Sequence, residues 1–280
     1  MEFIDSLMLL FKYVFLGFVQ GLTEPLPISS SGHVLLMRHF LNVEIKGLSF
    51  EIIVNTGSLI AIIVIYRKDL YQLTKSTIQF LLQPKSRPDV RSEFNFVLYL
   101  IIATIPAGVI GLFFGDFISD RFSTIRTVGI TLLFTGVALW IIRNLRGNKG
   151  DFDLSIKEAL IIGLAQTVAL IPGISRSGAT LVAAMLLGLK RQTALKFSFL
   201  LYIPISLGVA ALSITDIMND PFFNDLMIPY IVAFIAAILT SYFALRWFMD
   251  IMKRGKLLYF SFYCFIVGTI VTILSFTFIG

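Results

Sequence analysis

The chain has 280 residues, of which 57% are hydrophobic and only 14% are charged, with a mean hydropathy of +0.88. Soluble domains carry about 25% charged residues, so the composition excludes a soluble enzyme and predicts an integral membrane protein. In a membrane protein, a net charge of +6 is explained by basic residues in the cytoplasmic loops. It therefore does not indicate a nucleic-acid partner. A single cysteine, Cys264, excludes a disulfide framework and a cysteine-based metal site.

The first apolar region, residues 3–42, is interrupted near its middle by Glu24 and by Pro25-Leu26-Pro27. Its charge-free runs, 13–23 and 25–37, have 11 and 13 residues, whereas a membrane-spanning helix needs about 20. A charge at mid-membrane depth is also unfavourable unless protein or water surrounds it. We therefore expect residues 3–42 to form a re-entrant helical hairpin that does not cross the membrane.

Long intervals without charged residues predict the crossings, because each is close to the length that spans the hydrocarbon core. The first half of the chain has three of them, at 52–66, 94–115 and 127–142. Between the first two intervals, residues 67–91 carry many charges and are expected to form the longest polar loop.

A second broken region, residues 154–189, has the same organisation as the first. Pro172-Gly173 and Arg176 interrupt its apolar run, and we again expect a re-entrant hairpin. Three further charge-free intervals follow and predict crossings at 197–215, 226–245 and 257–280.

The two halves of the chain are related by an internal repeat. A shift of 146 residues lays Gly17-Phe-Val-Gln20 on Gly163-Leu-Ala-Gln166, and Ile28-Ser-Ser-Ser-Gly32 on Ile174-Ser-Arg-Ser-Gly178. Three crossings in each half place the second half upside down. We therefore expect an all-α polytopic membrane protein with an inverted-topology repeat. Its one integral membrane domain consists of residues 1–146 and 147–280, and each half is a re-entrant helical hairpin plus three transmembrane helices.

The basic residues predict which side is cytoplasmic, because cytoplasmic loops carry an excess of Lys and Arg. With both termini on one side, sixteen basic residues fall on the opposite side and four on the side of the termini. Both termini are therefore expected outside the cytoplasm.

The tip of the first hairpin contains a carboxylate and, a few residues later, a helix start that favours an anion. Gln20 and Glu24 share a helix face, and Pro25 ends the helix beside them. The run Ser29-Ser30-Ser31-Gly32-His33 then predicts an N-cap and first turn. The free backbone N–H groups of such a turn favour an anion.

The tip of the second hairpin repeats this design with an arginine, which is suited to bidentate phosphate contacts. The expected anion ligands there are Ser175, Arg176, Ser177, Gly178 and Thr180.

Several of these residues also have a purely structural interpretation. The serines are typical helix caps, and Gln20 and Gln166 are typical of hydrogen bonds between membrane helices. Glu51, at the edge of a crossing, is either an ion-pair partner or a site residue. Glu24, His33 and Arg176 are different, because ionisable groups at mid-membrane depth mark functional sites.

The motifs Gln20-x-x-x-Glu24, Pro27-x-Ser-Ser-x-Gly-His33 and Pro172-Gly-x-Ser-Arg-Ser-Gly-Ala-Thr180 together resemble the bacterial undecaprenyl pyrophosphate phosphatase family, also called bacitracin resistance protein. The resemblance covers nearly the whole chain. It implies a multi-pass enzyme of the bacterial cytoplasmic membrane that hydrolyses undecaprenyl diphosphate to undecaprenyl phosphate. The product is the lipid carrier reused in cell-wall and peptidoglycan synthesis, and the activity implies bacitracin resistance.

The resemblance also implies a divalent cation, Mg²⁺ or Ca²⁺. The first motif position, often Glu in the family, is Gln20 here, so a role for two carboxylates at positions 20 and 24 is in doubt. Glu24, aided by Glu51, is then the expected metal ligand. The expected partners are the polyprenyl diphosphate and membrane lipid, with no nucleic acid; a homodimer is left open.

The expected mechanism uses these residues for binding, proton transfer and attack. Arg176 and the backbone of residues 175–178 bind the diphosphate, with Ser29 and Gly32 of the first tip also expected to contact it. Glu24 holds the cation or acts as general base, Gln20 orients it, and either Ser30 or His33 is the nucleophile. A transporter or flippase for a polyprenyl phosphate lipid is the alternative, because inverted repeats with broken helices also build secondary transporters.

Overall fold

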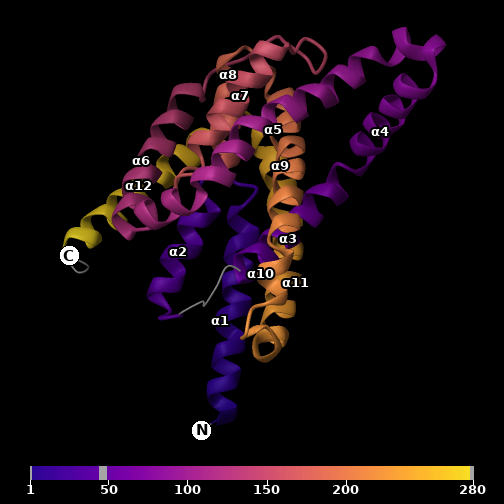
Figure 1. The fold of residues 1–280 in the computed structure, drawn as a ribbon. Helices are drawn as coiled ribbons and strands as arrows, with labels where there is room; N and C mark the ends of the chain where they lie inside the picture. The colour runs from indigo at the N-terminus through magenta and orange to yellow at the C-terminus, as the bar shows by residue number, and fades with distance from the viewer. Residues whose placement is uncertain (1, 44–48, 278–280) are drawn as a thin grey trace.

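The computed structural model describes residues 2–43 and 49–277, and within them the chain is helical and contains no β-sheet (Figure 1). Six helices are long and apolar enough to cross a membrane, and a bent helix pair raises this number to seven. The predicted class, an all-α polytopic membrane protein, is therefore confirmed. The helices are α1 (Glu2–Thr23), α2 (Ser30–Phe40), α3 (Ser49–Ile65), α4 (Arg67–Leu82), the 3₁₀ turn η1 (Pro84–Ser86), α5 (Arg87–Phe122), α6 (Ile125–Ile142), α7 (Ile156–Val168), α8 (Arg176–Leu186), α9 (Arg191–Leu212), α10 (Ile214–Met218), α11 (Phe223–Lys253) and α12 (Leu258–Thr277).

Five of the six predicted crossings fall on helices that are long and apolar enough to span, namely α5, α6, α9, α11 and α12. The last interval extends to Gly280, and residues 278–280 lie outside the described part of the chain. The remaining interval, 52–66, falls on α3, which qualifies only together with α4 and is bent from it by 75°.

The segment 67–91, expected to be a loop, is instead helical and belongs to α4, η1 and the first turn of α5. The expectation was wrong because charge alone was taken as a sign of a loop. Apolar residues at helical spacing within the segment, among them Leu70 and Leu73, allow it to pack. The rings of Phe80 and Phe94 stack 3.9 Å apart and join α4 to α5.

Helix α1 begins at Glu2 and has 22 residues. It is therefore longer than the charge-free run 13–23 that was expected to form the first part of the hairpin. Lys12 lies within it and does not break it. A lysine can extend its ammonium group toward the interface and leave its stem in an apolar environment. By length and composition α1 alone could cross a membrane, whereas α7, with 13 residues, is too short.

Each hairpin is interrupted by a short non-helical segment, residues 24–29 in the first and 169–175 in the second, and these segments are called the two breaks. The helices that follow the breaks have equal lengths and related positions. Helices α2 and α8 each have 11 residues, and their bounds differ by the 146-residue shift of the repeat. Ser29 caps α2 by accepting a hydrogen bond from the backbone N–H of Gly32 at 3.3 Å. Ser175 caps α8 in the same way, from Gly178 at 3.1 Å. The repeated serines therefore set where both helices begin.

The helices that lead into the breaks pack closely on long helices from the other half of the chain. Helix α1 lies along α11, and α7 lies along α5 (Figure 1). A Cβ on Gly17 would overlap the backbone of Ala233, and a Cβ on Gly163 would overlap that of Ala103. The repeated Gly-x-x-Gln sequence thus contains the small residue that allows each close helix contact.

The two breaks meet inside the helix bundle. Ser177 Oγ donates a hydrogen bond of 3.4 Å to the carbonyl of Leu26, and Thr131 of α6 donates one of 2.9 Å to the carbonyl of Pro172. Gly32 faces the backbone of Gly173. The two breaks, which are far apart in sequence, are therefore in direct contact, and the pocket described next lies at this contact.

Candidate active site

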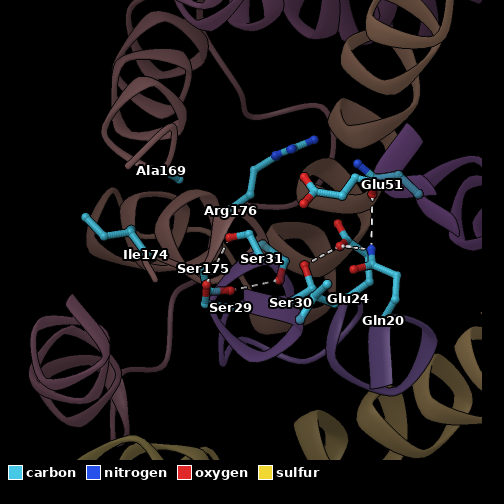
Figure 2. Close-up of a pocket in the computed structure, with 13 residues that line it drawn as sticks. Gln20, Glu24, Ser29, Ser30, Ser31, Glu51, Ala169, Ile174, Ser175 and Arg176 are labelled. Carbon is cyan, nitrogen blue, oxygen red and sulfur yellow. Dashed lines mark hydrogen bonds between the residues drawn. The ribbon is translucent and has the colours of Figure 1, made fainter. Parts of the chain in front are cut away.

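A pocket lies where the two breaks meet the first turns of α3 (Figure 2). Both tips and α3 contribute side chains to it, so it combines the polar residues of the two halves. Its lining residues are Gln20, Glu24, Ser29, Ser30, Ser31, Val34, Glu51, Asn55, Ala169, Ile174, Ser175, Arg176 and Ser177.

Ser30 and Glu24 are directly connected in this pocket. Ser30 is the first residue of α2, and its Oγ donates a short hydrogen bond to Glu24 Oε2. Gln20 Nε2 donates to the same carboxylate oxygen at 2.8 Å. A hydroxyl bonded to a carboxylate that a third group orients is the arrangement of a nucleophile with its base.

The residue before Ser30 has an unusual backbone conformation. Ser29 has φ +67° and ψ +96°, and a non-glycine residue in this region costs about 1–3 kcal/mol. Such strain persists only where the surrounding structure enforces it. Here it turns the chain sharply between Ile28 and α2, and Ser30 projects toward Glu24 (Figure 2).

Arg176 supplies an incompletely paired cation to the same pocket. It is the first residue of α8, and its Nη1 atom is buried without a hydrogen-bond partner among the described residues. Its guanidinium lies 5.4 Å from the ring centre of Tyr202. A buried donor without a partner is costly, and a guanidinium binds phosphate through paired, charge-assisted hydrogen bonds. An anion in this pocket would satisfy it.

The N-terminal ends of α2 and α8 add positive potential to this pocket. Ser29 and Ser31 lie 3.3 Å apart through their Oγ atoms, and Ser175 and Ser177 repeat this contact at 3.3 Å. All four line the pocket beside the first turns of the two helices. Helix N-termini carry about half a positive charge each, so two of them with Arg176 favour a multiply charged anion.

The ring of His33 does not line this pocket. His33 Nδ1 lies 2.7 Å from the carbonyl of Ser29, and Nε2 lies 2.7 Å from the hydroxyl of Tyr263 on α12. A carbonyl only accepts, so Nδ1 carries the proton and Nε2 accepts from Tyr263. Both ring nitrogens are occupied, and the side chain supports the strained turn at Ser29.

Four other predicted residues are not among those that line the pocket. Thr180 donates to the carbonyl of Arg176 at 3.1 Å, within its own helix. Gly32 and Gly178 form the tight contacts of the two tips with Gly173 and with Pro27. Gln166 is buried, and its Nε2 has no partner among the described residues.

Glu51 makes the expected kind of ion pair and also lines the pocket. Its carboxylate accepts a hydrogen bond of 2.6 Å from Arg38, and the same residue lines the exposed edge of the pocket.

Two residues of the hydrogen-bond network around Gln20 were not predicted from the sequence. Asn55 Oδ1 accepts from Gln20 Nε2 at 3.3 Å and from the hydroxyl of Tyr202 at 2.7 Å. The network therefore holds Gln20, and through it Glu24, in place. A polar amide inside the apolar interval 52–66 was a signal for Asn55, whereas no feature of the sequence distinguishes Tyr202 from the other tyrosines.

The lining residues are compatible with a divalent cation. The described residues contain no group of three or more Asp, Glu, His or Cys side chains that could enclose a metal. Glu24 and Glu51 nevertheless line one pocket together. Mg²⁺ in phosphoryl-transfer sites is typically held by one or two carboxylates and by the substrate phosphates, so these two carboxylates fit such an ion.

The family match and the similar proteins all point to one family of membrane diphosphatases. Residues 13–270 match the family described as "Bacitracin resistance protein BacA". The chain is 59% identical over 262 residues to "Undecaprenyl-diphosphatase 1" of Bacillus cereus, covering 94% of this chain and 96% of the relative. It is 54% identical over 277 residues to "Undecaprenyl-diphosphatase" of Oceanobacillus iheyensis, covering 98% and 99%. It is 53% identical over 269 residues to "Undecaprenyl-diphosphatase 1" of Bacillus licheniformis, covering 96% and 99%.

Proposed function

The chain belongs to the bacitracin resistance protein BacA family and hydrolyses undecaprenyl diphosphate to undecaprenyl phosphate, and on this premise we propose that the reaction takes place in the pocket at the two tips. One observation carries the proposal: the Ser30 hydroxyl, hydrogen-bonded to Glu24, shares this pocket with the partly unpaired Arg176. The transporter alternative is not favoured, because the relatives are named as diphosphatases.

Ser30 is the proposed nucleophile. Its Oγ attacks the terminal phosphorus and transfers its proton to Glu24. The bond from that phosphorus to the bridging oxygen breaks, and the bridging oxygen leaves with the electron pair as part of undecaprenyl phosphate. Water then attacks the phosphoserine, Glu24 returns the proton to Oγ, and the products are inorganic phosphate and free Ser30.

Arg176 and the two helix N-termini bind the diphosphate in this proposal. The transferred phosphoryl group carries charge on its equatorial oxygens in the transition state. A guanidinium and backbone N–H groups that are already fixed in place stabilise that charge without reorganisation. Arg176 is the first residue of α8, so its guanidinium and the N-terminal amides of that helix can contact the same anion.

His33 acts as a positioning residue in this proposal, and Tyr263 orients it. The imidazole donates to the carbonyl of Ser29 and accepts from Tyr263. It therefore stabilises the turn that aims Ser30 at Glu24. Gln20 and Asn55 do the same for the carboxylate from the other side.

Glu24 and Glu51 are the proposed ligands of a divalent cation, Mg²⁺ or Ca²⁺. Such an ion neutralises charge on the diphosphate oxygens when it is bound. The exposure of Glu51 at the pocket edge leaves one side of the site open to metal and substrate.

We further propose that the pocket opens to the outer face of the membrane, with both termini outside. The exposed edge of the pocket is formed by Ser31 and Glu51. Glu51 lies in the first turn of α3, directly after the connection from α2, and the predicted topology places that end of α3 on the side of the membrane with fewer basic residues.

The test is phosphate release from undecaprenyl diphosphate by purified protein in detergent, where a transporter has no two sides to connect. We expect Ser30→Ala to abolish release, and Ser31→Ala, the adjacent serine of the same turn, to retain most of it. Brief incubation with terminally labelled substrate should label the wild-type enzyme on Ser30. Normal release by Ser30→Ala, or label on His33, would refute the assignment of the nucleophile.

A further inference from the structure

A second cavity, separate from the active-site pocket, lies where α9 begins and α11 ends. It has a volume of about 520 Å³, which is within the range of small-molecule sites, about 300–1,000 Å³. Its lining combines cations with large apolar side chains, including Arg146, Lys190, Arg191, Leu195, Met249 and Met252. The established reaction assigns no role to it.

Three of the cations that line this cavity make no salt bridge with an acidic side chain in the described part of the chain. Lys196 pairs with Asp69 and Asp151, at 2.6 and 3.0 Å, and Lys253 pairs with Asp250 at 3.3 Å. In contrast, no salt bridge within the described residues involves the remaining cations, Arg146, Lys190 and Arg191. The cavity therefore has an excess of positive charge.

Arg191 is fixed in place and is still missing a hydrogen-bond partner. Its Nη2 donates to the carbonyl of Arg143 at 3.0 Å. Its guanidinium lies against Gly255, which has φ +71° and leaves no room for a Cβ. The Nε–H is buried and has no partner among the described residues. A rigid guanidinium with an unmet donor is suited to an anion.

Helix α9 adds backbone donors to the same cavity. Lys190 is its N-cap residue and makes no side-chain capping hydrogen bond. The N-cap side chain therefore does not occupy the first-turn amides of this 22-residue helix, which lie beside Lys190 and Arg191. The dipole of this helix favours a negative charge at that point.

The apolar part of the lining distinguishes a lipid from a small free anion. Met249 and Met252 of α11 and Leu195 of α9 lie next to the cations. Methionine adapts its shape to flexible apolar ligands, and basic pockets between membrane helices bind the headgroups of anionic lipids. We propose that this cavity binds the phosphate of an anionic membrane phospholipid, with the start of its acyl chains against the methionines.

The test uses purified protein in phosphatidylcholine nanodiscs with increasing phosphatidylglycerol, and reads the thermal unfolding midpoint. A ligand that binds only the folded protein raises this midpoint. We expect a saturable rise with the wild type, and at least a tenfold higher half-saturating phosphatidylglycerol content for Arg146→Gln with Lys190→Gln. Both residues are exposed, so this variant should fold.

The matched control is Arg91→Gln with Lys157→Gln, which removes two exposed cations outside the cavity. It should titrate like the wild type. Equal weakening in the control would show nonspecific attraction to anionic lipid and overturn the proposal. An equal rise with inorganic phosphate in pure phosphatidylcholine would assign the cavity to free phosphate and would also overturn it. Phosphate release by each variant checks that it is folded.

Discussion

Replacing Arg176 with methionine should separate substrate binding from folding, because this side chain is incompletely paired in the free protein. Its buried Nη1 has no partner among the described residues. Methionine keeps much of the apolar stem and removes the charge. We therefore expect Arg176→Met to lose activity without losing stability.

The magnitude follows from the hydrogen bonds that a diphosphate would make. Two hydrogen bonds from a guanidinium, at about 1.5–3 kcal/mol each, give about 3–6 kcal/mol. With about 1.4 kcal/mol per factor of ten, the loss in kcat/KM is about 10²- to 10⁴-fold. Leaving a buried donor unsatisfied costs about 1–3 kcal/mol, so its removal should raise the unfolding midpoint by about 2 °C or more.

The assay combines phosphate release with thermal unfolding of the same detergent preparation. Arg126→Met is the matched control, because Arg126 is exposed and lies over Phe276, 4.3 Å from its ring centre, far in sequence from the pocket residues. It should keep normal kcat/KM. If Arg176→Met kept normal activity, or unfolded several degrees below the wild type, the interpretation of Arg176 as an unsatisfied anion ligand would be wrong.

Three further predictions concern the supports of the site. Tyr263→Phe removes one hydrogen bond to His33 and should lower kcat about 5- to 10-fold with little change in KM, consistent with about 1 kcal/mol; an unchanged kcat in steady-state phosphate release would argue against positioning. Chelation should abolish release, and Glu51→Gln should raise the concentration of Mg²⁺ needed for half-maximal rate; a metal requirement that stays the same would remove Glu51 as a ligand. Burial raises the pKa of Glu158, but hydrogen bonds from Lys149 and Ser155 outweigh it and hold that pKa below its ordinary value. Because a lowered folded pKa stabilises the protein above the ordinary glutamate range and this stabilisation is lost in acid, the wild-type unfolding midpoint should fall more steeply below about pH 4.5 than that of Glu158→Gln.

The sequence predicted the parts of the molecule that depend on local chemistry. Prolines and serines are placed where they end and cap helices, so the starts of α2 and α8 followed from their motifs. Charged groups that lipid would reject must meet inside the protein, and Glu24 and Arg176 indeed line one pocket.

The rest depends on tertiary packing, which a single sequence does not specify. The direction of the His33 ring is set by Tyr263, 230 residues away. The role of Asn55 depends on Tyr202, which approaches from α9. Helix α4 was missed because its charged residues were given more weight than its apolar residues at helical spacing, which pack against α5.

The crossed packing of α1 on α11 and of α7 on α5 has a consequence for how such a protein could arise. The helix that leads into each tip packs on a helix from the other half of the chain, so cleavage between residues 146 and 147 would yield two fragments that each lack this contact. Co-expression of both fragments should be needed to recover an enzyme. A half-length ancestor would have needed to insert in both orientations and to function as an antiparallel pair. After gene fusion the two halves could diverge, so that the carboxylate is now in the first half and the arginine in the second.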